Sequence, residues 1–288
     1  MDSATGLCYE TYGDRANPPL LLIMGIGTQL NGWDRGFVDG LAGAGFFVIR
    51  YDHRDVGLSR RSDGTPDLAA IRRGDLRTLP YTLDDLAADA VGLLDALGIS
   101  RVHLLGASMG GMVAQLVAIT YPERVLSLCS LMSSTGDRSV GQAHPATMEL
   151  MRRPAPATRE EVVEAAVERS RVLAGSGFPF DEDAARSRAA VAYDRAHDPA
   201  GRLRQQAAAI ASPDRTVALR GLRVPTLVVH GSDDRLIDVS GGRATANAVP
   251  GALLEVVDGM GHGIVPGAWS QIIAAIRHNA ARATGDNR

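Results

Sequence analysis

RVHLLGASMGG, residues 101–111, is the stretch from which the fold of this chain is predicted. Apolar residues 102–105 indicate a buried strand, and a helical pattern follows the motif. A serine at the apex of such a sharp strand-to-helix turn has a strained backbone, and side chains two positions to either side would collide there. Glycine at Gly106 and Gly110 makes the turn feasible, and the turn directs the Ser108 hydroxyl out of the sheet.

Two later strands also end in polar loops, PTLVVHGSDD at 225–234 and LLEVVDGMGHG at 253–263. Parallel strands have their carboxyl ends at one edge of a sheet, so we expect Ser108, Asp234 and His262 to converge there. A serine hydroxyl is a poor nucleophile at neutral pH. An imidazole has to accept its proton, and a carboxylate has to orient that imidazole. We therefore predict Ser108, Asp234 and His262 as catalytic residues.

Two other carboxylates remain candidates for the acid. Asp233 precedes Asp234 in the same loop, and Asp137 follows the strand predicted at 125–131. The position of the loop relative to the strand that carries the serine favours Asp234.

The other histidines fit structural roles. His103 lies inside the strand before the serine, His53 belongs to a polar loop, and His230 precedes the acid loop, which we expect it to support. The sequence has no H-E-x-x-H motif and no histidine and carboxylate spacing typical of a metal site. The predicted chemistry requires neither a metal nor an organic cofactor.

Stabilising a tetrahedral oxyanion requires two backbone donors. The amide of Met109 begins the helix after the serine, where the helix dipole favours negative charge. The glycine-rich loop Gly25-Ile26-Gly27 follows an apolar strand, and the amide of Ile26 is the predicted second donor. This loop lacks both G-x-G-x-x-G and G-x-x-x-x-G-K-[ST], so we do not predict a nucleotide site.

Strands and helices alternate along most of the chain, which predicts an α/β fold with a mostly parallel sheet and helices on both faces. The alternation breaks after the fifth strand, where only helical patterns occur. We predict a core formed by residues 1–134 and 219–288 and a helical cap formed by residues 135–218. The predicted strands are 7–12, 20–24, 46–50, 101–105, 125–131, 225–229 and 252–257. The predicted cap helices are 143–151, 159–173, 183–197 and 201–211.

The insertion lies between the strand after the serine helix and the strand that leads to the acid, so its ends should lie near the catalytic edge. The cap should therefore cover the site, with Pro154 and Pro156 separating its helical units. Several apolar side chains are candidates for the pocket lining, although packing within the cap is the favoured role for any one of them. These are Met148, Leu150, Met151, Phe178 and Phe180. The cap arginines are expected to form mainly a solvated face, which does not favour a carboxylate-bearing substrate. They are Arg152, Arg153, Arg169, Arg171, Arg186 and Arg188.

Composition is that of a globular enzyme. The chain has 288 residues, enough for one large α/β core with an insertion, and 45% of them are hydrophobic. Its net charge of −3 favours neither nucleic acid nor an anionic membrane as a partner. No signal peptide and no membrane span are evident, and Cys8 and Cys129 do not form a disulfide framework. A cytoplasmic location and a small-molecule substrate are expected.

Five motifs together resemble the α/β-hydrolase fold superfamily over nearly the whole chain. The sequence looks particularly like the actinobacterial carboxylesterases of that superfamily and is similar to aclacinomycin methylesterases, which hydrolyse a methyl ester on a polyketide antibiotic. One departure is that many relatives have His-Gly where this chain has Met24-Gly25, although the methylesterases also have methionine. The motifs are MGIG from Met24, YDHRDVGLS from Tyr51, GASMGG from Gly106, HGSDD from His230 and GMGH from Gly259.

The resemblance implies that Ser108, Asp234 and His262 form a catalytic triad and that the amides of Ile26 and Met109 form the oxyanion hole. Relatives that are dehalogenases or epoxide hydrolases have an aspartate where this chain has Ser108, so the resemblance favours acyl transfer. The expected function is a serine hydrolase that cleaves carboxylic esters through an acyl-enzyme, with a methyl ester of a polyketide or another small hydrophobic ester as substrate.

Several alternatives stay open. The same triad can open lactones, carry out perhydrolysis or hydrolyse C–C bonds. A ligand-binding receptor built on this fold is the alternative outside enzymes, and the presence of all three triad residues disfavours it.

Overall fold

A single sheet forms the centre of the computed structural model, which describes residues 5–153 and 156–283. Its strand order is β1-β3-β2-β4-β5-β6-β7, in which β1 pairs antiparallel with β3 and every other neighbouring pair is parallel. The predicted mostly parallel α/β fold is confirmed. The strands are β1 (Tyr9–Tyr12), β2 (Pro19–Ile23), β3 (Phe47–Tyr51), β4 (Val102–Ala107), β5 (Val125–Leu131), β6 (Thr226–Gly231) and β7 (Leu253–Val257).

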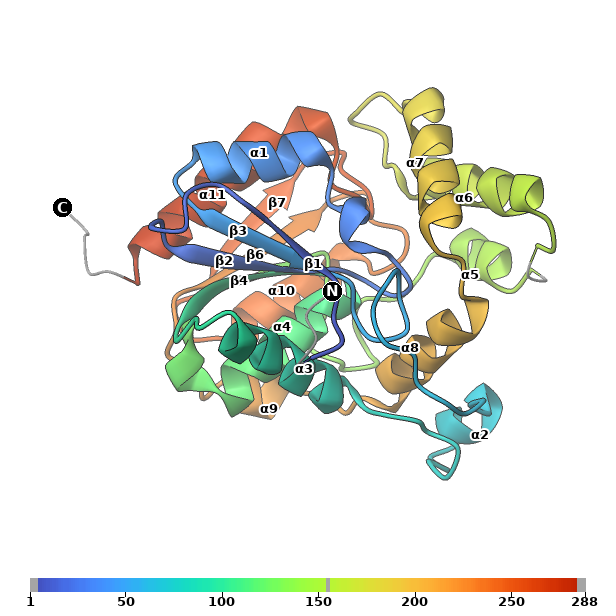
Figure 1. Ribbon diagram of the computed structural model, residues 1–288, viewed down its shortest axis with the longest axis horizontal. Helices are drawn as coiled ribbons and strands as arrows, with labels where there is room; N and C mark the ends of the chain where they lie inside the picture. Colours follow the sequence, from blue (N-terminus) through green and yellow to red (C-terminus); the bar gives the residue numbers. More distant parts are fainter. Residues whose placement is uncertain (1–4, 154–155, 284–288) are drawn as a thin grey trace.

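Helices cover both faces of the sheet (Figure 1). One face packs against α1 (Arg35–Gly43) and α11 (Trp269–Ala281). The opposite face packs against α3 (Leu83–Ala96), α4 (Met109–Thr120) and α10 (Val239–Ala248). Short helical turns join these elements at η1 (Leu30–Gly32), η2 (Pro122–Arg124) and η3 (Pro266–Ala268).

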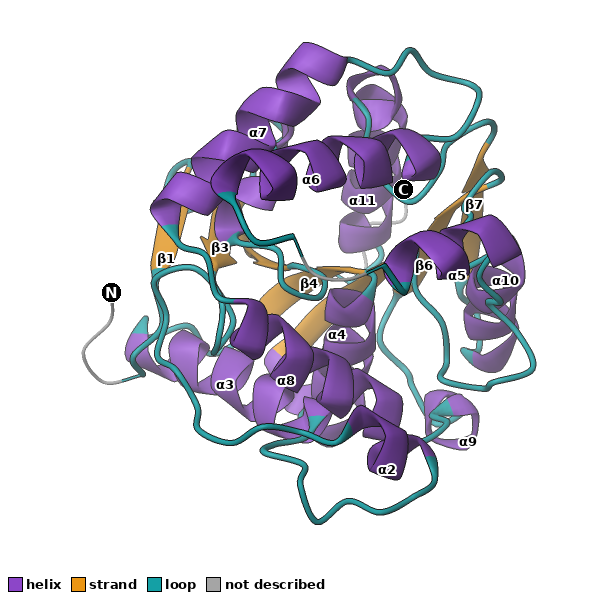
Figure 2. Ribbon diagram, turned by 90° about the vertical axis from the view of Figure 1, so that its right-hand side faces the viewer, coloured by secondary structure: helices purple, strands orange, loops and turns teal. Residues whose placement is uncertain are grey.

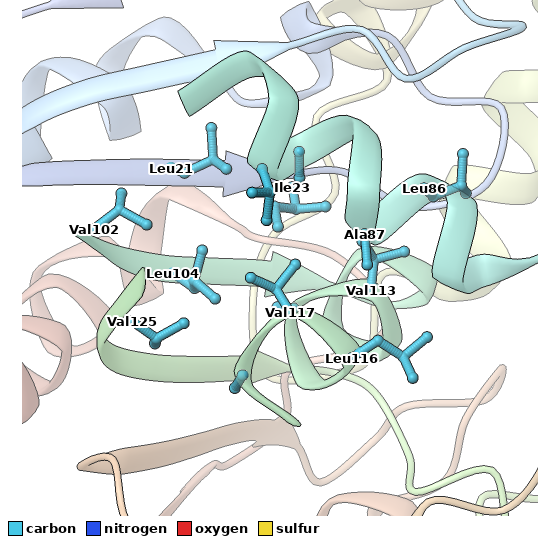
Figure 3. Close-up of a cluster of buried hydrophobic side chains, with 14 of the residues drawn as sticks. Leu21, Ile23, Leu86, Ala87, Val102, Leu104, Val113, Leu116, Val117 and Val125 are labelled. Carbon is cyan, nitrogen blue, oxygen red and sulfur yellow. The ribbon is translucent and has the colours of Figure 1, made fainter. Parts of the chain in front are cut away.

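Two hydrophobic clusters lie on the two faces because successive side chains of a strand point in opposite directions. In β2, Leu21 and Ile23 belong to the cluster that includes α3 and α4, whereas Leu20 and Leu22 belong to the cluster that includes α1 and α11. Figure 3 shows the first cluster, where Val113 and Val117 of α4 pack over β4. Burial on both faces explains why the central strands read as continuous apolar runs.

His103 illustrates what a polar residue needs inside this sheet. Its ring lies 5.7 Å from the Phe46 ring, and its Nδ1 is 2.8 Å from Ser127 Oγ. Burial lowers the pKa of His103 to about 4. The structure thus agrees with the packed role predicted for this histidine.

The free energy of unfolding should therefore fall as the pH drops from about 6.5 towards 4, because the unfolded chain protonates this imidazole before the folded protein does. The stabilisation is fully present above the unfolded pKa. We expect His103 to account for about 2–3 kcal/mol of the loss between pH 7 and pH 4.5. Urea unfolding of the wild type and of His103→Gln at both pH values measures it. Equal pH dependence in the two proteins would contradict the expectation.

The described residues of the segment predicted as a cap form helices joined by loops. These helices are α5 (Pro145–Met151), α6 (Arg159–Leu173), α7 (Glu182–Arg195), α8 (Pro199–Ala211) and α9 (Thr216–Leu219). Figure 2 shows α5, α6, α7 and α8 on the side of the molecule where β4 ends. Pro154, one of the residues predicted to separate these units, lies outside the described residues.

Two short helices were absent from the sequence-based prediction. They are α2 (Leu68–Arg72), which packs against α8, and α9, which packs against α10. Helices of one turn have too few residues for a hydrophobic period to be visible, and their stability comes from tertiary packing. No helix in the described part of the chain is long and apolar enough to cross a membrane.

Candidate active site

Ser108 lies at the turn between β4 and α4 with a φ of 56°, in the left-handed region that L-residues rarely adopt. The neighbouring glycines make this turn sterically feasible. A Cβ on Gly106 would lie 2.1 Å from the Gly110 carbonyl oxygen, and a Cβ on Gly110 would lie 2.0 Å from the Ile23 carbonyl oxygen. Glycine is therefore required at both positions, as the motif predicts.

The strained turn is held by hydrogen bonds with β5 and with the residues that follow it. The Ser108 amide donates to the Leu131 carbonyl at 2.9 Å, and the Ser133 hydroxyl donates to the Ser108 carbonyl at 2.8 Å. Strain at a single residue persists only where its surroundings hold it in place. Ser108 itself is only partly buried, so its side chain remains accessible.

The loop after β2 lies directly against this serine. A Cβ on Gly25 would be 3.2 Å from Ser108 Cβ and 3.6 Å from Ser108 Oγ. The Gly27 amide, two residues on, donates to Gln205 Oε1 of α8 at 2.8 Å. The predicted donor Ile26 lies between these two anchored glycines, and Met109 begins α4 directly after the serine.

His262 and Asp234 form a direct pair at the ends of β7 and β6. The His262 Nδ1 donates to Asp234 Oδ2 at 2.7 Å. The other oxygen, Oδ1, accepts the amides of Leu236 and Ile237 at 2.8 and 2.9 Å. The Asp234 side chain is fully buried and that of His262 is 8% exposed.

These contacts keep the Asp234 carboxylate charged. Burial raises its pKa, but the hydrogen bonds from His230 and His262, the charge of His262 and the Ile237 amide outweigh burial and hold the pKa well below its usual range. The carboxylate is ionised throughout the neutral pH range, so it accepts the hydrogen bond from His262 as an anion.

His230 supports the acid loop, in the role that the sequence indicates. It is completely buried in β6, and its Nε2 lies 2.7 Å from the Ile237 carbonyl and 3.3 Å from Asp234 Oδ2. Both neighbours accept hydrogen bonds, so Nε2 carries the proton. The ring thus links the two ends of the turn 234–237.

The two alternative carboxylates make other contacts. Asp233 Oδ2 accepts the amide and the hydroxyl of Ser176 at 3.0 and 2.5 Å. Asp137 Oδ1 accepts the amide and the hydroxyl of Ser139. Of the three carboxylates considered, Asp234 is the one that contacts His262.

The structure brings the predicted residues to one edge of the sheet without joining all of them. Ser108 follows β4, whereas the His262 and Asp234 pair follows β7 and β6, beyond β5. Among the hydrogen bonds of residues 5–153 and 156–283, none joins the Ser108 hydroxyl to His262. The same described residues contain no cluster of three side chains suited to holding a metal ion.

The end of α6 and the residues that follow it hold the loop of His262 at this edge. The amide of His262 donates to the Leu173 carbonyl at 2.7 Å, and that of Gly261 donates to the Ala174 carbonyl at 3.1 Å. The Gly177 amide donates back to the Gly259 carbonyl at 2.9 Å. The position of the histidine therefore depends on residues from the predicted cap.

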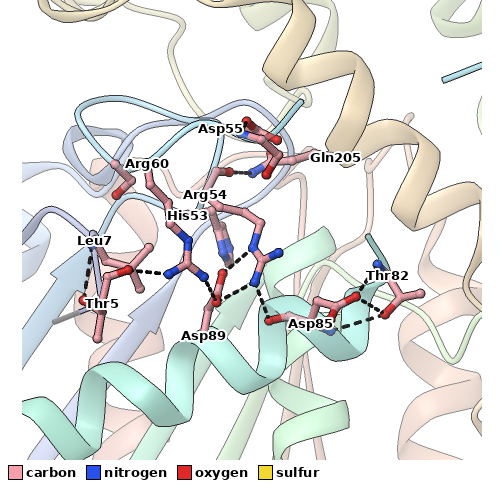
Figure 4. A network of polar contacts seen from close by, with 12 residues as sticks. Thr5, Leu7, His53, Arg54, Asp55, Arg60, Thr82, Asp85, Asp89 and Gln205 are labelled. Carbon is pink, nitrogen blue, oxygen red and sulfur yellow. Dashed lines mark hydrogen bonds and ion pairs between the residues drawn. The ribbon is translucent and has the colours of Figure 1, made fainter. Parts of the chain in front are cut away.

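The polar loop after β3 carries His53, Arg54 and Asp55, which Figure 4 shows within a network of polar contacts. His53 Nε2 donates to the Met24 carbonyl at 3.1 Å, and burial lowers the pKa of His53 to about 4, so the ring is neutral. Arg54 pairs with buried Asp89 at 2.5 Å. The structure thus shows this loop as a hydrogen-bonded support, as the sequence indicates.

Gln205 is the residue of this region that the sequence analysis missed. It is fully buried, accepts from the Gly27 amide, and donates from Nε2 to the Arg54 carbonyl at 3.0 Å (Figure 4). Its partner Gly27 is 178 positions away in the chain. A glutamine in an amphipathic helix gives no sequence signal for such a contact.

For Met148, Leu150 and Met151, a place in the pocket lining stays a prediction. Phe178 packs against the core cluster, and a Cβ on Gly267 would lie 2.6 Å from its ring. The Phe180 ring lies under the Arg171 guanidinium at 4.9 Å. For these two rings, packing accounts for the side-chain position.

Comparison with known proteins agrees with this architecture. A model of the alpha/beta hydrolase fold family matches residues 18–266. Rhodomycin D methylesterase of Streptomyces peucetius is 32% identical over 96% of this chain and 95% of its own length. 3-Oxoadipate enol-lactonase 2 of Acinetobacter baylyi is 27% identical over 88% of this chain and 85% of its own length.

Among solved structures, a hydrolase from Pseudomonas aeruginosa PA01 is 25% identical, covers 97% of this chain and 94% of its own, and has a TM-score of 0.67. The resemblance inferred from the five motifs is confirmed. The chain belongs to the alpha/beta hydrolase fold family.

Proposed function

We propose that this protein is a serine hydrolase that cleaves carboxylic esters through an acyl-enzyme. One observation carries the proposal: a fully buried, ionised Asp234 holds His262 at the sheet edge where the strained, partly buried Ser108 lies. A carboxylate, an imidazole and an accessible serine on three neighbouring loops are the components of nucleophilic acyl transfer.

In the proposed acylation, His262 Nε2 removes the proton from the Ser108 hydroxyl as Oγ attacks the ester carbonyl. Asp234 keeps the other proton on Nδ1 and stabilises the imidazolium that forms. The amides of Met109 and Ile26 donate to the oxyanion. The imidazolium then returns the proton to the alcohol oxygen as the ester C–O bond breaks.

Deacylation repeats these steps with water in place of the serine. His262 removes a proton from the water, the resulting hydroxide adds to the acyl carbon, and Ser108 leaves with the proton that the imidazolium returns. The acid product and the free enzyme result, and this chain's own residues handle each proton.

A small ester is the proposed substrate class. Rhodomycin D methylesterase, a relative that matches 96% of the chain, is named a methylesterase, which supports an ester with a small alcohol. A lactone is the second candidate, because an enol-lactonase is also a relative and a lactone is an internal ester. A panel of methyl esters and lactones distinguishes these substrates by kcat/KM.

Residues 135–218 are proposed to form a cap over this site. The contacts of Leu173, Ala174 and Gly177 with the histidine loop support the proposal, as does the contact of Gln205 with Gly27. The side chains that face the substrate would then come from this segment, which makes it the source of substrate selectivity.

A fluorophosphonate probe tests the proposed nucleophile. Such a reagent forms a bond from its phosphorus to an activated serine oxygen and releases fluoride. We expect stoichiometric labelling of the native protein at Ser108, identified by peptide mass spectrometry, and none of urea-unfolded protein. Labelling spread over other serines, or none in the native protein, would overturn the proposed function.

Replacing Gln205 with leucine should lower kcat for a 4-nitrophenyl ester by about tenfold or more. The change leaves the partly buried Gly27 amide and Arg54 carbonyl without this partner, at a cost of at most about 1–3 kcal/mol each, and releases the oxyanion loop. Steady-state kinetics, with unfolding curves to report stability, check this result.

Gln206→Leu, one position along α8, is the matched control and should retain activity. In Gln205→Glu the carboxylate still accepts from Gly27 but no longer donates to Arg54, so an intermediate kcat is expected. If Gln205→Leu and Gln206→Leu have the same kcat, Gln205 does not position the loop.

A further inference from the structure

Two arginines of the cap helices approach the candidate site without a carboxylate partner. Arg169 is in α6 and Arg202 is in α8, and both are partly buried. Burial lowers the pKa of Arg169, and burial together with the charge of Arg169 lowers the pKa of Arg202 to about 10. The positive charge of Arg169 thus acts on the Arg202 guanidinium.

No carboxylate of the described residues lies within ion-pair distance of either guanidinium. Three other partly or fully buried arginines near the loop after β3 are paired with carboxylates: Arg54 with Asp89 at 2.5 Å, Arg195 with Asp52 at 2.7 Å and Arg204 with Asp55 at 2.9 Å. Buried Arg215 has neutral partners instead, since it donates to Gln115, Ser212 and the Ser134 carbonyl. Charges removed from water are normally paired, and two like charges side by side cost free energy. The pair is thus suited to an anion that comes from outside the chain.

Arg202 contacts the loop that adjoins Ser108. Its Nη1 lies 3.5 Å from the Ile26 carbonyl oxygen, and a Cβ on Gly27 would lie 2.9 Å from its Cγ. Gln205, three residues further along α8, contacts the same loop. This face of α8 therefore lies on the Gly25–Gly27 loop, which touches Ser108.

The helix that carries Arg169 lies on the other side of the site, next to the histidine loop. Arg169 lies four residues before Leu173 and so on the same face of α6, and the Leu173 carbonyl accepts the His262 amide. In Figure 2, α6 and α8 lie on opposite sides of the end of β4. The pair thus joins a helix next to the histidine loop with a helix next to the oxyanion loop.

We infer that Arg169 and Arg202 together bind a free carboxylate of the substrate, so that the enzyme prefers esters that carry a second, ionised carboxyl group. This inference rests on the proposed ester hydrolysis and specifies its substrate class. Guanidinium groups match a carboxylate with paired N–H donors, and an anion between them removes their mutual repulsion. It replaces the expectation of a solvated face at Arg169, and it gives a role to Arg202, to which the sequence assigned none.

The test compares mono-4-nitrophenyl adipate with 4-nitrophenyl hexanoate, which differ in the terminal carboxylate. We expect the wild type to favour the adipate in kcat/KM by about tenfold or more, the size of a charged hydrogen bond. Arg169→Gln and Arg202→Gln should each lower that ratio by a similar factor, and Arg169→Lys should lower it less. Arg188→Gln removes an exposed cap charge and should leave the ratio unchanged.

A ratio near one in the wild type, or a ratio that neither glutamine variant lowers, overturns the inference while Ser108-dependent cleavage of the hexanoate leaves the proposed function intact. Absence of cleavage of both esters, together with no phosphonate labelling, overturns the proposed function itself. Competitive inhibition of the wild-type enzyme tests the inference without any variant. Adipate should compete with the hexanoate and adipamide should not, whereas competition by inorganic phosphate alone would contradict a carboxylate site.

Discussion

Ser108→Ala is expected to lower kcat for a 4-nitrophenyl ester by about 10⁴- to 10⁶-fold, because no other group can form the acyl-enzyme. The oxyanion donors and the His262 and Asp234 pair remain in this variant, so substrate binding should survive. End-point and steady-state assays of nitrophenolate release measure this fall in kcat. Ser187→Ala, at an exposed position of α7, is the matched control and should keep full activity.

The same position permits a test of strain. Alanine at 108 keeps a Cβ at a φ of 56°, whereas glycine adopts this conformation freely. Relief of about 1–3 kcal/mol of strain should offset the entropic cost of glycine, about 0.5–1 kcal/mol. Ser108→Gly should thus be inactive yet at least as stable to urea as Ser108→Ala. Retained turnover in either variant would remove the proposed mechanism.

Asp234→Asn is expected to lower kcat by about 10⁴-fold with little change in the fold. An asparagine amide can donate to His262 Nδ1, which would leave the proton on the nitrogen that has to accept it from Ser108. The variant also loses a carboxylate whose pKa is held low by its surroundings. Activity of the variant should stay low across the neutral pH range, because asparagine does not titrate.

The neighbouring carboxylates supply the controls. Asp233→Asn and Asp137→Asn remove the charges that contact Ser176 and Ser139, but neither side chain contacts His262. Both variants should retain kcat within a few-fold of the wild type. A large loss in Asp137→Asn with retained activity in Asp234→Asn would reassign the acid to the loop after β5.

Local sequence predicted the sheet well because its strands are buried on both faces. Continuous apolar runs identified β4, β5 and β6 to within two residues of their observed ends. The turn at Ser108 was equally predictable, since only glycine fits at Gly106 and Gly110. Each of these features depends on residues that are neighbours along the chain.

Contacts between distant loops came only from the tertiary structure. The sequence favoured Asp234 over Asp233 and expected His230 to support the acid loop, but the contacts that explain both roles depend on how the turn after β6 orients its side chains. The role of Gln205 gave no signal in the sequence, because it depends on an amide and a carbonyl of distant loops.

The arginines show the same division at its clearest. In the sequence, Arg169 and Arg202 are two of many charged residues on predicted helices; Arg169 was expected on a solvated face, and Arg202 gave no signal of a role. Packing of α6 and α8 over one sheet edge removes both from full solvation and leaves them together without a carboxylate. The chain by itself determined the α/β fold and the serine turn, because both follow from short-range sterics and hydrophobic period. Tertiary packing alone decided which charges face the site, because burial and pairing depend on elements far apart in sequence.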